Sequence, residues 1–114
     1  MTIYTCENTF EAMMTCIYDA WDSKKGHQNI RLKAEPVGDM ELFCEYRPIQ
    51  TDTAKAKKVI RSIQRKLSNT AYIMVYRCAM SEQPDKLDRI YRFLLLGFAY
   101  PDKITDMLQH PYVN

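Results

Sequence analysis

The hydrophobic pattern of this chain changes its period after Gln50, and that change constrains the fold more than any other feature of the sequence. Before Gln50, short segments alternate apolar and polar side chains, as strands do. After it, apolar residues recur three and four positions apart, as they do in amphipathic helices. The sequence therefore predicts an α+β fold, in which a small two- or three-stranded N-terminal sheet is followed by a predominantly α-helical cluster.

Three segments have the alternation of strands, namely residues 2–6, 30–36 and 40–49. Pro36 and Gly38 separate the second segment from the third, because both residue types favour turns. Pro48 indicates an edge strand or the end of a strand, because proline has no N–H to donate to a neighbouring strand. The two later segments are therefore predicted to be short strands that can pair with the first.

A helix is predicted between the first strand and the second. Asn8 or Thr9 can cap it, since a side-chain oxygen there accepts from the unpaired N–H groups of the first turn. Its apolar side consists of Phe10, Met13, Met14, Ile17 and Trp21. Gly26 is expected to end it, as a left-handed cap after two lysines.

Four more helices are predicted after Gln50, over residues 54–67, 69–80, 81–97 and 100–111. Asp52 or Thr53 can cap the first of them. The second carries Ile73, Tyr76 and Met80 on one side, and Pro111 lies at the end of the last. We interpret the whole chain, residues 1–114, as a single domain.

The composition is that of an ordinary globular protein, with 46% hydrophobic and 26% charged residues and a net charge of +2. The N-terminus lacks the basic and apolar regions of a signal peptide. The longest apolar run, residues 93–100, is far shorter than the roughly 20 residues of a membrane helix. We therefore expect a cytoplasmic protein without membrane contact.

The four cysteines are widely spaced and form no Cys-x-x-Cys pair, so we expect reduced thiols rather than a disulfide framework or a zinc site. Two other arrangements could carry chemistry, but neither has supporting spacing. Cys78 with His110 would be a nucleophile and base, and two carboxylate pairs, Asp19 with Asp22 and Asp85 with Asp88, could approach a metal. We predict no catalytic residue, no metal and no cofactor, and we favour a chain without catalytic activity of its own over an enzyme.

The segment from Ala54 to Leu67 contains six basic residues and no acid. At 100° per residue, its apolar residues share an arc of about 100° and should face the core; they are Ala56, Val59, Ile60, Ile63 and Leu67. The opposite half carries Lys55, Lys57, Lys58, Arg61, Arg65 and Lys66. These six residues are the candidate nucleic-acid-binding residues, because clustered positive charge on a rigid face releases counterions from a polyanion.

A second interpretation is that this half of the helix is only a solvated surface. Acids of neighbouring segments would then neutralise it, such as Glu82, Asp85 and Asp88. The absence of acidic residues from this basic segment favours phosphate binding. The small net charge of the chain and the lack of aromatic residues interleaved with the basic ones oppose it. Six aromatic residues elsewhere could stack on bases, but their helical spacing among Leu and Ile favours core packing; they are Tyr72, Tyr76, Tyr91, Phe93, Phe98 and Tyr100.

The order of five segments along nearly the whole chain resembles that of a bacterial family assigned to DNA metabolism or DNA repair. The segments read "IYTCENTFEAMMTCIYDAW", "AKKVIRSIQRKLS", "AYIMVYRCAMSEQPD", "IYRFLLLGF" and "KITDMLQHPYV". Members of that family are typically encoded beside a radical-SAM protein of DNA modification or repair, and a similar domain is fused to uracil-DNA-glycosylase-like domains. No segment is a catalytic signature, and the family provides no catalytic residues to transfer to this chain.

The resemblance implies an accessory nucleic-acid-binding domain in a DNA metabolism system. It also implies an alternative, an adaptor that docks onto the radical-SAM partner without touching nucleic acid. Members of the family continue well beyond the "HPYV" segment, so this chain is expected to be the N-terminal part of a longer architecture or a short relative. In that case the apolar run near Leu94, Leu95, Leu96 and Phe98 would be exposed and could form a homodimer.

Overall fold

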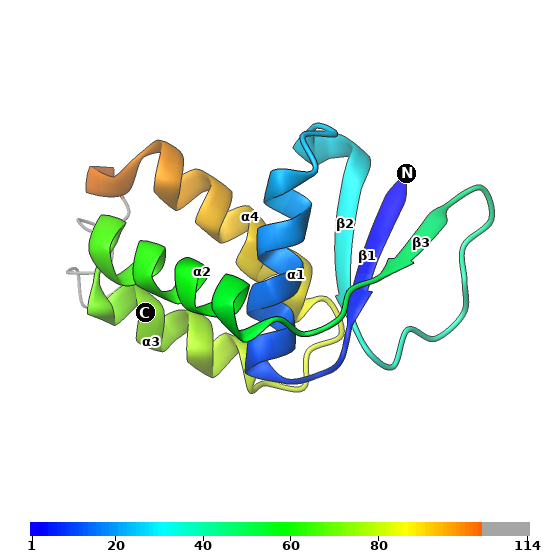
Figure 1. The fold of residues 1–114 in the computed structure, drawn as a ribbon, viewed down its shortest axis with the longest axis horizontal. Helices are drawn as coiled ribbons and strands as arrows, with labels where there is room; N and C mark the ends of the chain where they lie inside the picture. Colours follow the sequence, from blue (N-terminus) through cyan, green and yellow to red (C-terminus); the bar gives the residue numbers. More distant parts are fainter. Residues whose placement is uncertain (104–114) are drawn as a thin grey trace.

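The structure is a computed structural model that describes residues 1–103, and it contains a three-stranded sheet beside four α-helices (Figure 1). The elements in chain order are β1 (Thr2–Cys6), α1 (Phe10–Asp22), a 3-10 turn η1 (His27–Asn29), β2 (Ile30–Ala34), β3 (Glu45–Pro48), α2 (Thr53–Lys66), α3 (Asn69–Ala79) and α4 (Lys86–Ala99). The sheet comes first and the helical cluster follows, so the predicted α+β class is confirmed. No helix in this part of the chain is long and apolar enough to cross a bilayer.

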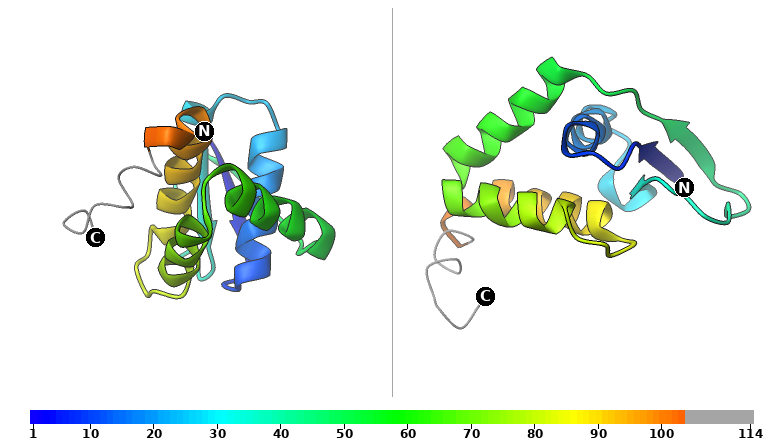
Figure 2. Two further views of the ribbon diagram at one scale, coloured as in Figure 1. Left: turned by 90° about the vertical axis from the view of Figure 1, so that its left-hand side faces the viewer. Right: turned by 90° about the horizontal axis from the view of Figure 1, so that it is seen from below.

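The sheet is entirely parallel, with β1 in the centre between β2 and β3. Parallel neighbours need a long connection, and α1 supplies it between β1 and β2. Tyr4 lies opposite Leu32 in the register of β1 with β2, and both side chains are buried. The helices lie on one side of this sheet, as the three ribbon views show (Figures 1 and 2).

The other side of the sheet carries Ile3 with its two register neighbours, Arg31 on β2 and Tyr46 on β3. Both neighbours contact Glu41, which belongs to the connection between β2 and β3. Arg31 pairs with the Glu41 carboxylate at 3.2 Å, and the Tyr46 hydroxyl accepts the Glu41 N–H at 2.8 Å. This connection therefore covers part of the second face, and Ile3 is buried.

Both edges of the sheet are protected against pairing with another strand. On the β2 edge, Asp88 of α4 accepts the N–H of Leu32 at 3.1 Å, and the Arg92 guanidinium donates to the carbonyl of Ile30. The two α4 side chains thus take the place of a fourth strand. On the β3 edge, Pro48 ends the strand and offers no N–H, which confirms the expected role of this proline.

The predicted core face of α2 is confirmed: Ala56, Val59, Ile63 and Leu67 are buried and Ile60 is half-buried. Other predictions need correction. Within residues 40–49 only Glu45–Pro48 forms a strand, because Phe43 has a φ of 64° and leaves the extended conformation. Met40, Leu42 and Phe43 project into solvent instead.

The end of α1 also differs from the prediction, and α3 does not bury the side that carries its large apolar residues. Helix α1 ends at Asp22, and Lys24 adopts the left-handed conformation two positions before Gly26. On α3 the side with Ile73, Tyr76 and Met80 is exposed, whereas the small residues Ala71, Val75 and Ala79 are buried. Small side chains allow α3 to approach its neighbours closely. Most of the helix predicted over residues 100–111 lies outside the described residues.

Candidate nucleic-acid interface

The basic surface of the chain is held in place by contacts at the start of α2. Asp52 caps the helix, and its carboxylate accepts the N–H of Lys55 at 3.1 Å. The hydroxyl of Thr15 on α1 accepts the N–H of Asp52, also at 3.1 Å. Together with the buried face of α2, these bonds fix the helix on α1, so its charged side chains project from a rigid support.

Lys55 differs from the other five basic residues of α2, because it forms an ion pair. Its ammonium donates to Asp19 Oδ1 on α1 at 2.8 Å and lies 5.6 Å from the centre of the Tyr18 ring. The hydrogen bond with Asp19 raises the pKa of Lys55. The structure therefore places Lys55 in a contact between two helices, and we remove it from the candidate phosphate-binding residues.

The other five basic residues of α2 form no ion pair within residues 1–103; they are Lys57, Lys58, Arg61, Arg65 and Lys66. Two of the three acids that could have neutralised them form ion pairs elsewhere. Asp85, the N-cap residue of α4, pairs with Arg89 at 2.8 Å, and Asp88 pairs with Arg92 at 3.4 Å. Glu82 makes no ion pair in the described part of the chain.

These five residues form two rows along α2, one with four-residue spacing and one whose two lysines are eight residues apart. The outer row consists of Lys57, Arg61 and Arg65, which are exposed and whose side chains make no hydrogen bond, ion pair or ring contact with any of residues 1–103. The inner row consists of Lys58 and Lys66, with Ser62 between them, and it borders a pocket. Neighbours in the outer row are about 6 Å apart along the helix axis, and Lys58 and Lys66 are about 12 Å apart, since each residue rises 1.5 Å.

The pocket beside the inner row has a volume of about 330 Å³ and lies between α1 and α2, with Phe98 of α4 as a third wall. Tyr18 and Trp21 come from α1. The Trp21 and Phe98 rings meet edge to face with centroids 5.5 Å apart. The ammonium of Lys58 lies 5.8 Å from the Tyr18 ring centre, and that of Lys66 lies 5.8 Å from the Phe98 ring centre. We call this pocket the aromatic pocket.

This grouping was not predicted from the sequence. The basic helix itself contains no aromatic residue, and the aromatic side chains of the pocket come from two other helices. Trp21 was assigned to the buried side of α1, yet it is 42% exposed because it lies in the last turn, beyond the core. Of the six aromatic residues considered for stacking, only Phe98 lines the pocket. Tyr91 is fully buried, and Tyr76 and Tyr100 are exposed elsewhere.

The other candidates for chemistry have structural roles. Asp19 pairs with Lys55, and both carboxylates of the Asp85 and Asp88 pair bind arginines. No cluster of three or more metal-ligating side chains occurs within residues 1–103. Burial raises the pKa of the Cys78 thiol, which disfavours the nucleophilic thiolate. His110 lies outside the described residues.

The four thiols are free in the structure. Cys6 and Cys16 are buried, and a hydrogen bond with Cys6 together with burial raises the pKa of the Cys16 thiol. These two cysteines therefore behave as small apolar core residues.

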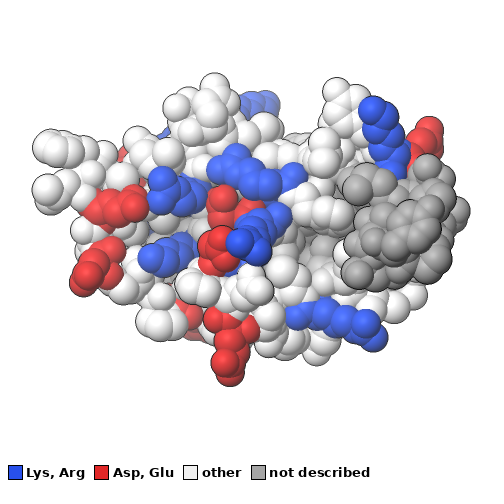
Figure 3. All heavy atoms as spheres, turned by 180° about the vertical axis from the view of Figure 1, so that it is seen from behind, with Lys and Arg blue, Asp and Glu red and all other residues white. Residues whose placement is uncertain are grey.

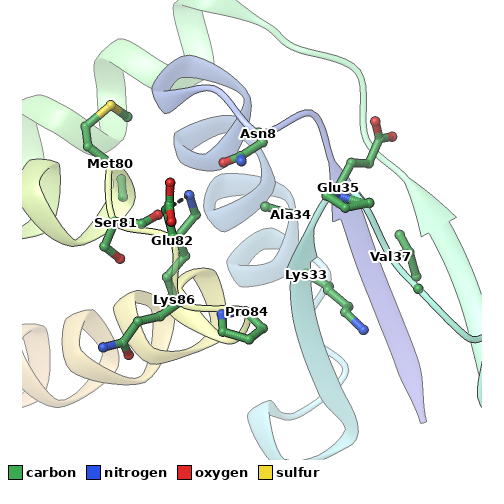
Figure 4. A pocket seen from close by; sticks show the side chains of 14 residues that line it. Asn8, Lys33, Ala34, Glu35, Val37, Met80, Ser81, Glu82, Pro84 and Lys86 are labelled. Atoms are coloured by element: carbon green, nitrogen blue, oxygen red, sulfur yellow. Dashed lines mark hydrogen bonds between the residues drawn. The ribbon is translucent and has the colours of Figure 1, made fainter.

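A larger hollow of about 630 Å³ lies where β1 and β2 end, next to the loop between α3 and α4 (Figure 4). Parallel sheets often bind ligands at this end of their strands. Its most unusual residue is Lys86, which is only 6% exposed. Its ammonium donates to the carbonyl of Ser81 at 2.9 Å and so closes the loop between two helices. Glu35 and Glu82 also line the hollow, so its charge is mixed.

Charge is also mixed on the molecular face that lies opposite α2. Helix α2 is turned toward the viewer in Figure 1. The reverse face, drawn in Figure 3, carries Asp and Glu among its Lys and Arg side chains. The uncompensated basic rows are therefore a local property of α2 and do not reflect the small net charge of +2.

Comparisons of the chain with protein-family models, curated proteins and solved structures give no match.

Proposed function

We propose that this chain is an accessory nucleic-acid-binding domain that contacts phosphates through the exposed half of α2 without reading sequence. The observation that carries the proposal is the five basic side chains of α2 that no acid of residues 1–103 neutralises. Neutralising phosphates with such side chains releases condensed counterions, which favours binding of any sequence. The resemblance to a DNA metabolism and repair family supports the same function.

The rigid support of α2 contributes to this function. Long basic side chains lose conformational entropy when they bind, but the helix that carries them does not have to be ordered first. Arg61 and Arg65 of the outer row can each present two parallel N–H groups to phosphate oxygens, which lysine cannot. We therefore expect the outer row to contribute most to phosphate binding.

Charge reversal of the outer row tests the proposal. The double variant Arg61→Glu and Arg65→Glu should lose nucleic-acid binding by tenfold or more while it melts at nearly the wild-type temperature, because exposed charges contribute little to stability. A control carries the same two changes at exposed arginines of β3 and α3, Arg47→Glu and Arg77→Glu, of which Arg47 pairs with Glu45 at 3.1 Å and Arg77 forms no ion pair within residues 1–103. If both double variants lose binding equally, the effect is one of net charge and α2 is not the site.

A second function, an adaptor that docks onto a radical-SAM partner, is favoured by a different observation. The connection between β2 and β3 exposes three large apolar side chains: Met40 at 65%, Leu42 at 83% and Phe43 at 99%. Apolar groups gathered at one exposed site are typical of protein-binding surfaces. A Leu42→Ser and Phe43→Ser variant should then lose co-purification with the partner while it keeps nucleic-acid binding.

The C-terminal apolar run is a weaker docking surface than the sequence indicates. Leu94 is fully buried in the core, and Leu95 and Phe98 are half-buried. Only Leu96 of the four predicted dimer residues has more than half of its surface exposed. A homodimer through this run would therefore rest mainly on one leucine, which is too little apolar surface for a stable interface.

A further inference from the structure

We propose that the aromatic pocket between α1 and α2 holds an unpaired base, so that the substrate class of the α2 surface is single-stranded nucleic acid. This inference rests on the proposed function, since the same helix supplies the phosphate contacts. It goes beyond that function because phosphate binding alone does not distinguish a single strand from a duplex.

The walls of the pocket have the chemistry that binds bases. Tyr18, Trp21 and Phe98 line it together with the apolar side chains Ile17 and Val59. Proteins that bind single strands without sequence preference combine such aromatic side chains with a positively charged groove, because every base has a π-face. Its volume of about 330 Å³ falls at the lower end of the roughly 300–1,000 Å³ of small-ligand sites, so it suits a group of one base rather than a large ligand.

The charges around the pocket are placed for a base with its flanking phosphates. Lys58 and Lys66 lie on the wall that α2 forms, and the outer row continues the positive surface on the same helix. Asp22 also lines the pocket and makes no ion pair within residues 1–103. Its carboxylate repels a phosphate but can accept a hydrogen bond from a base N–H, so the base enters and the phosphates remain at α2.

A duplex cannot use this pocket, because its bases are already stacked and paired. Extruding one of them costs unstacking and unpairing free energy that a single strand does not pay. A duplex should therefore bind only through the outer row, whereas a single strand should use the outer row and the pocket together.

Trp21 provides a direct measurement, because it is the only tryptophan in the chain. Its fluorescence would be recorded during titration with deoxythymidine and uridine oligomers of about ten nucleotides, which lies within the range of single-strand site sizes. The two oligomers test DNA against RNA. A duplex of the same length, an abasic oligomer and thymidine monophosphate are the comparisons. We expect at least one of the two single-stranded oligomers to quench the Trp21 fluorescence. The duplex, the abasic oligomer and thymidine monophosphate should quench it little.

Two substitutions separate stacking from folding. In an anisotropy titration with a fluorescently labelled oligomer, Trp21→Ala should lower the binding affinity about tenfold or more. This corresponds to the loss of one base–aromatic contact. It should leave duplex binding unchanged. Trp21→Phe keeps a ring in place and should retain most of the affinity. The matched control Phe43→Ala removes an aromatic ring that is 99% exposed on the connection between β2 and β3, and it should have no effect on oligomer binding.

The outcomes distinguish this inference from the proposed function. Equal binding of duplex and single strand without Trp21 quenching would overturn the pocket assignment and leave phosphate binding by α2 standing. Absence of binding to every oligomer would overturn both. Binding of thymidine monophosphate as tight as that of the oligomers would show that the pocket takes a free nucleotide, and would also overturn the assignment.

Discussion

The ammonium of Lys55 lies 2.8 Å from the Asp19 carboxylate, and this contact between α2 and α1 separates one lysine of the basic helix from the other five. A sequence pattern treats all six residues alike. The structure divides them into one residue that joins two helices and five that have no acidic partner within residues 1–103.

Lys55 and Lys57 should therefore respond differently to the same substitution. Lys55→Met removes the ion pair with Asp19 and should lower the melting temperature slightly, with little change in nucleic-acid affinity. Lys57→Met should lower the affinity and leave the melting temperature unchanged, because its exposed side chain makes no hydrogen bond, ion pair or ring contact with residues 1–103. Thermal melting followed by circular dichroism and an anisotropy titration measure the two properties. Equal losses of affinity would mean that Lys55 also binds phosphate.

The hydrogen bond from Leu32 to Asp88 predicts an unequal effect of two aspartate substitutions on α4. Asp88→Ala leaves the N–H of Leu32 without its acceptor at the sheet edge and should cost about 1–3 kcal/mol of unfolding free energy. Asp85→Ala removes only an exposed pair with Arg89 and should cost less than about 0.5 kcal/mol. Urea denaturation measures both. The role of α4 at the edge is wrong if the two costs are the same.

Two isoleucine substitutions test the assignment of the helix faces. Ile63 of α2 is fully buried, so Ile63→Ala should cost about 2–5 kcal/mol. Ile73 of α3 is 41% exposed, so Ile73→Ala should cost less than about 1 kcal/mol. Urea denaturation again provides the comparison. A larger cost at Ile73 than at Ile63 would show that α3 packs through the side that carries Ile73, Tyr76 and Met80.

The titration of Tyr91 predicts a loss of stability at high pH. Burial raises the pKa of Tyr91 to about 12, whereas a tyrosine of the unfolded chain titrates near 10. The unfolded state then loses its proton first, so the contribution of Tyr91 is complete below about pH 10 and is lost as the pH approaches 12. The difference in unfolding free energy between wild type and Tyr91→Phe should narrow over this interval. Parallel pH profiles would contradict the raised pKa.

Local patterns in the sequence predicted the elements well where neighbours along the chain decide the structure. The spacing of Ala56, Val59 and Ile63 identified the buried face of α2, and the side chain of Thr9 caps α1 as one of the two predicted alternatives. Contacts between distant segments were not predicted. Nothing near Leu32 indicates that Asp88, fifty-six positions later, accepts its N–H.

The same limit explains the candidate site. Trp21, Lys66 and Phe98 belong to three helices, so no window of the sequence contains the aromatic pocket. The apolar spacing of α1 includes Trp21, but this ring is exposed because it lies in the last turn of the helix, beyond the core. The failure at residues 40–49 is different. There an alternating pattern exists, but Phe43 adopts a positive φ, so residues 40–44 form no strand and only Glu45–Pro48 pairs with β1.

The salt dependence of binding to duplex DNA tests the central claim, phosphate binding by α2, most directly. If three or four phosphates are engaged, the logarithm of the binding constant should fall against the logarithm of the salt concentration with a slope of about −3, near −0.9 for each contact. Arg61→Ala should make that slope smaller by about one. A slope near zero, or a slope that Arg61→Ala leaves unchanged, would contradict the claim that this surface binds phosphates.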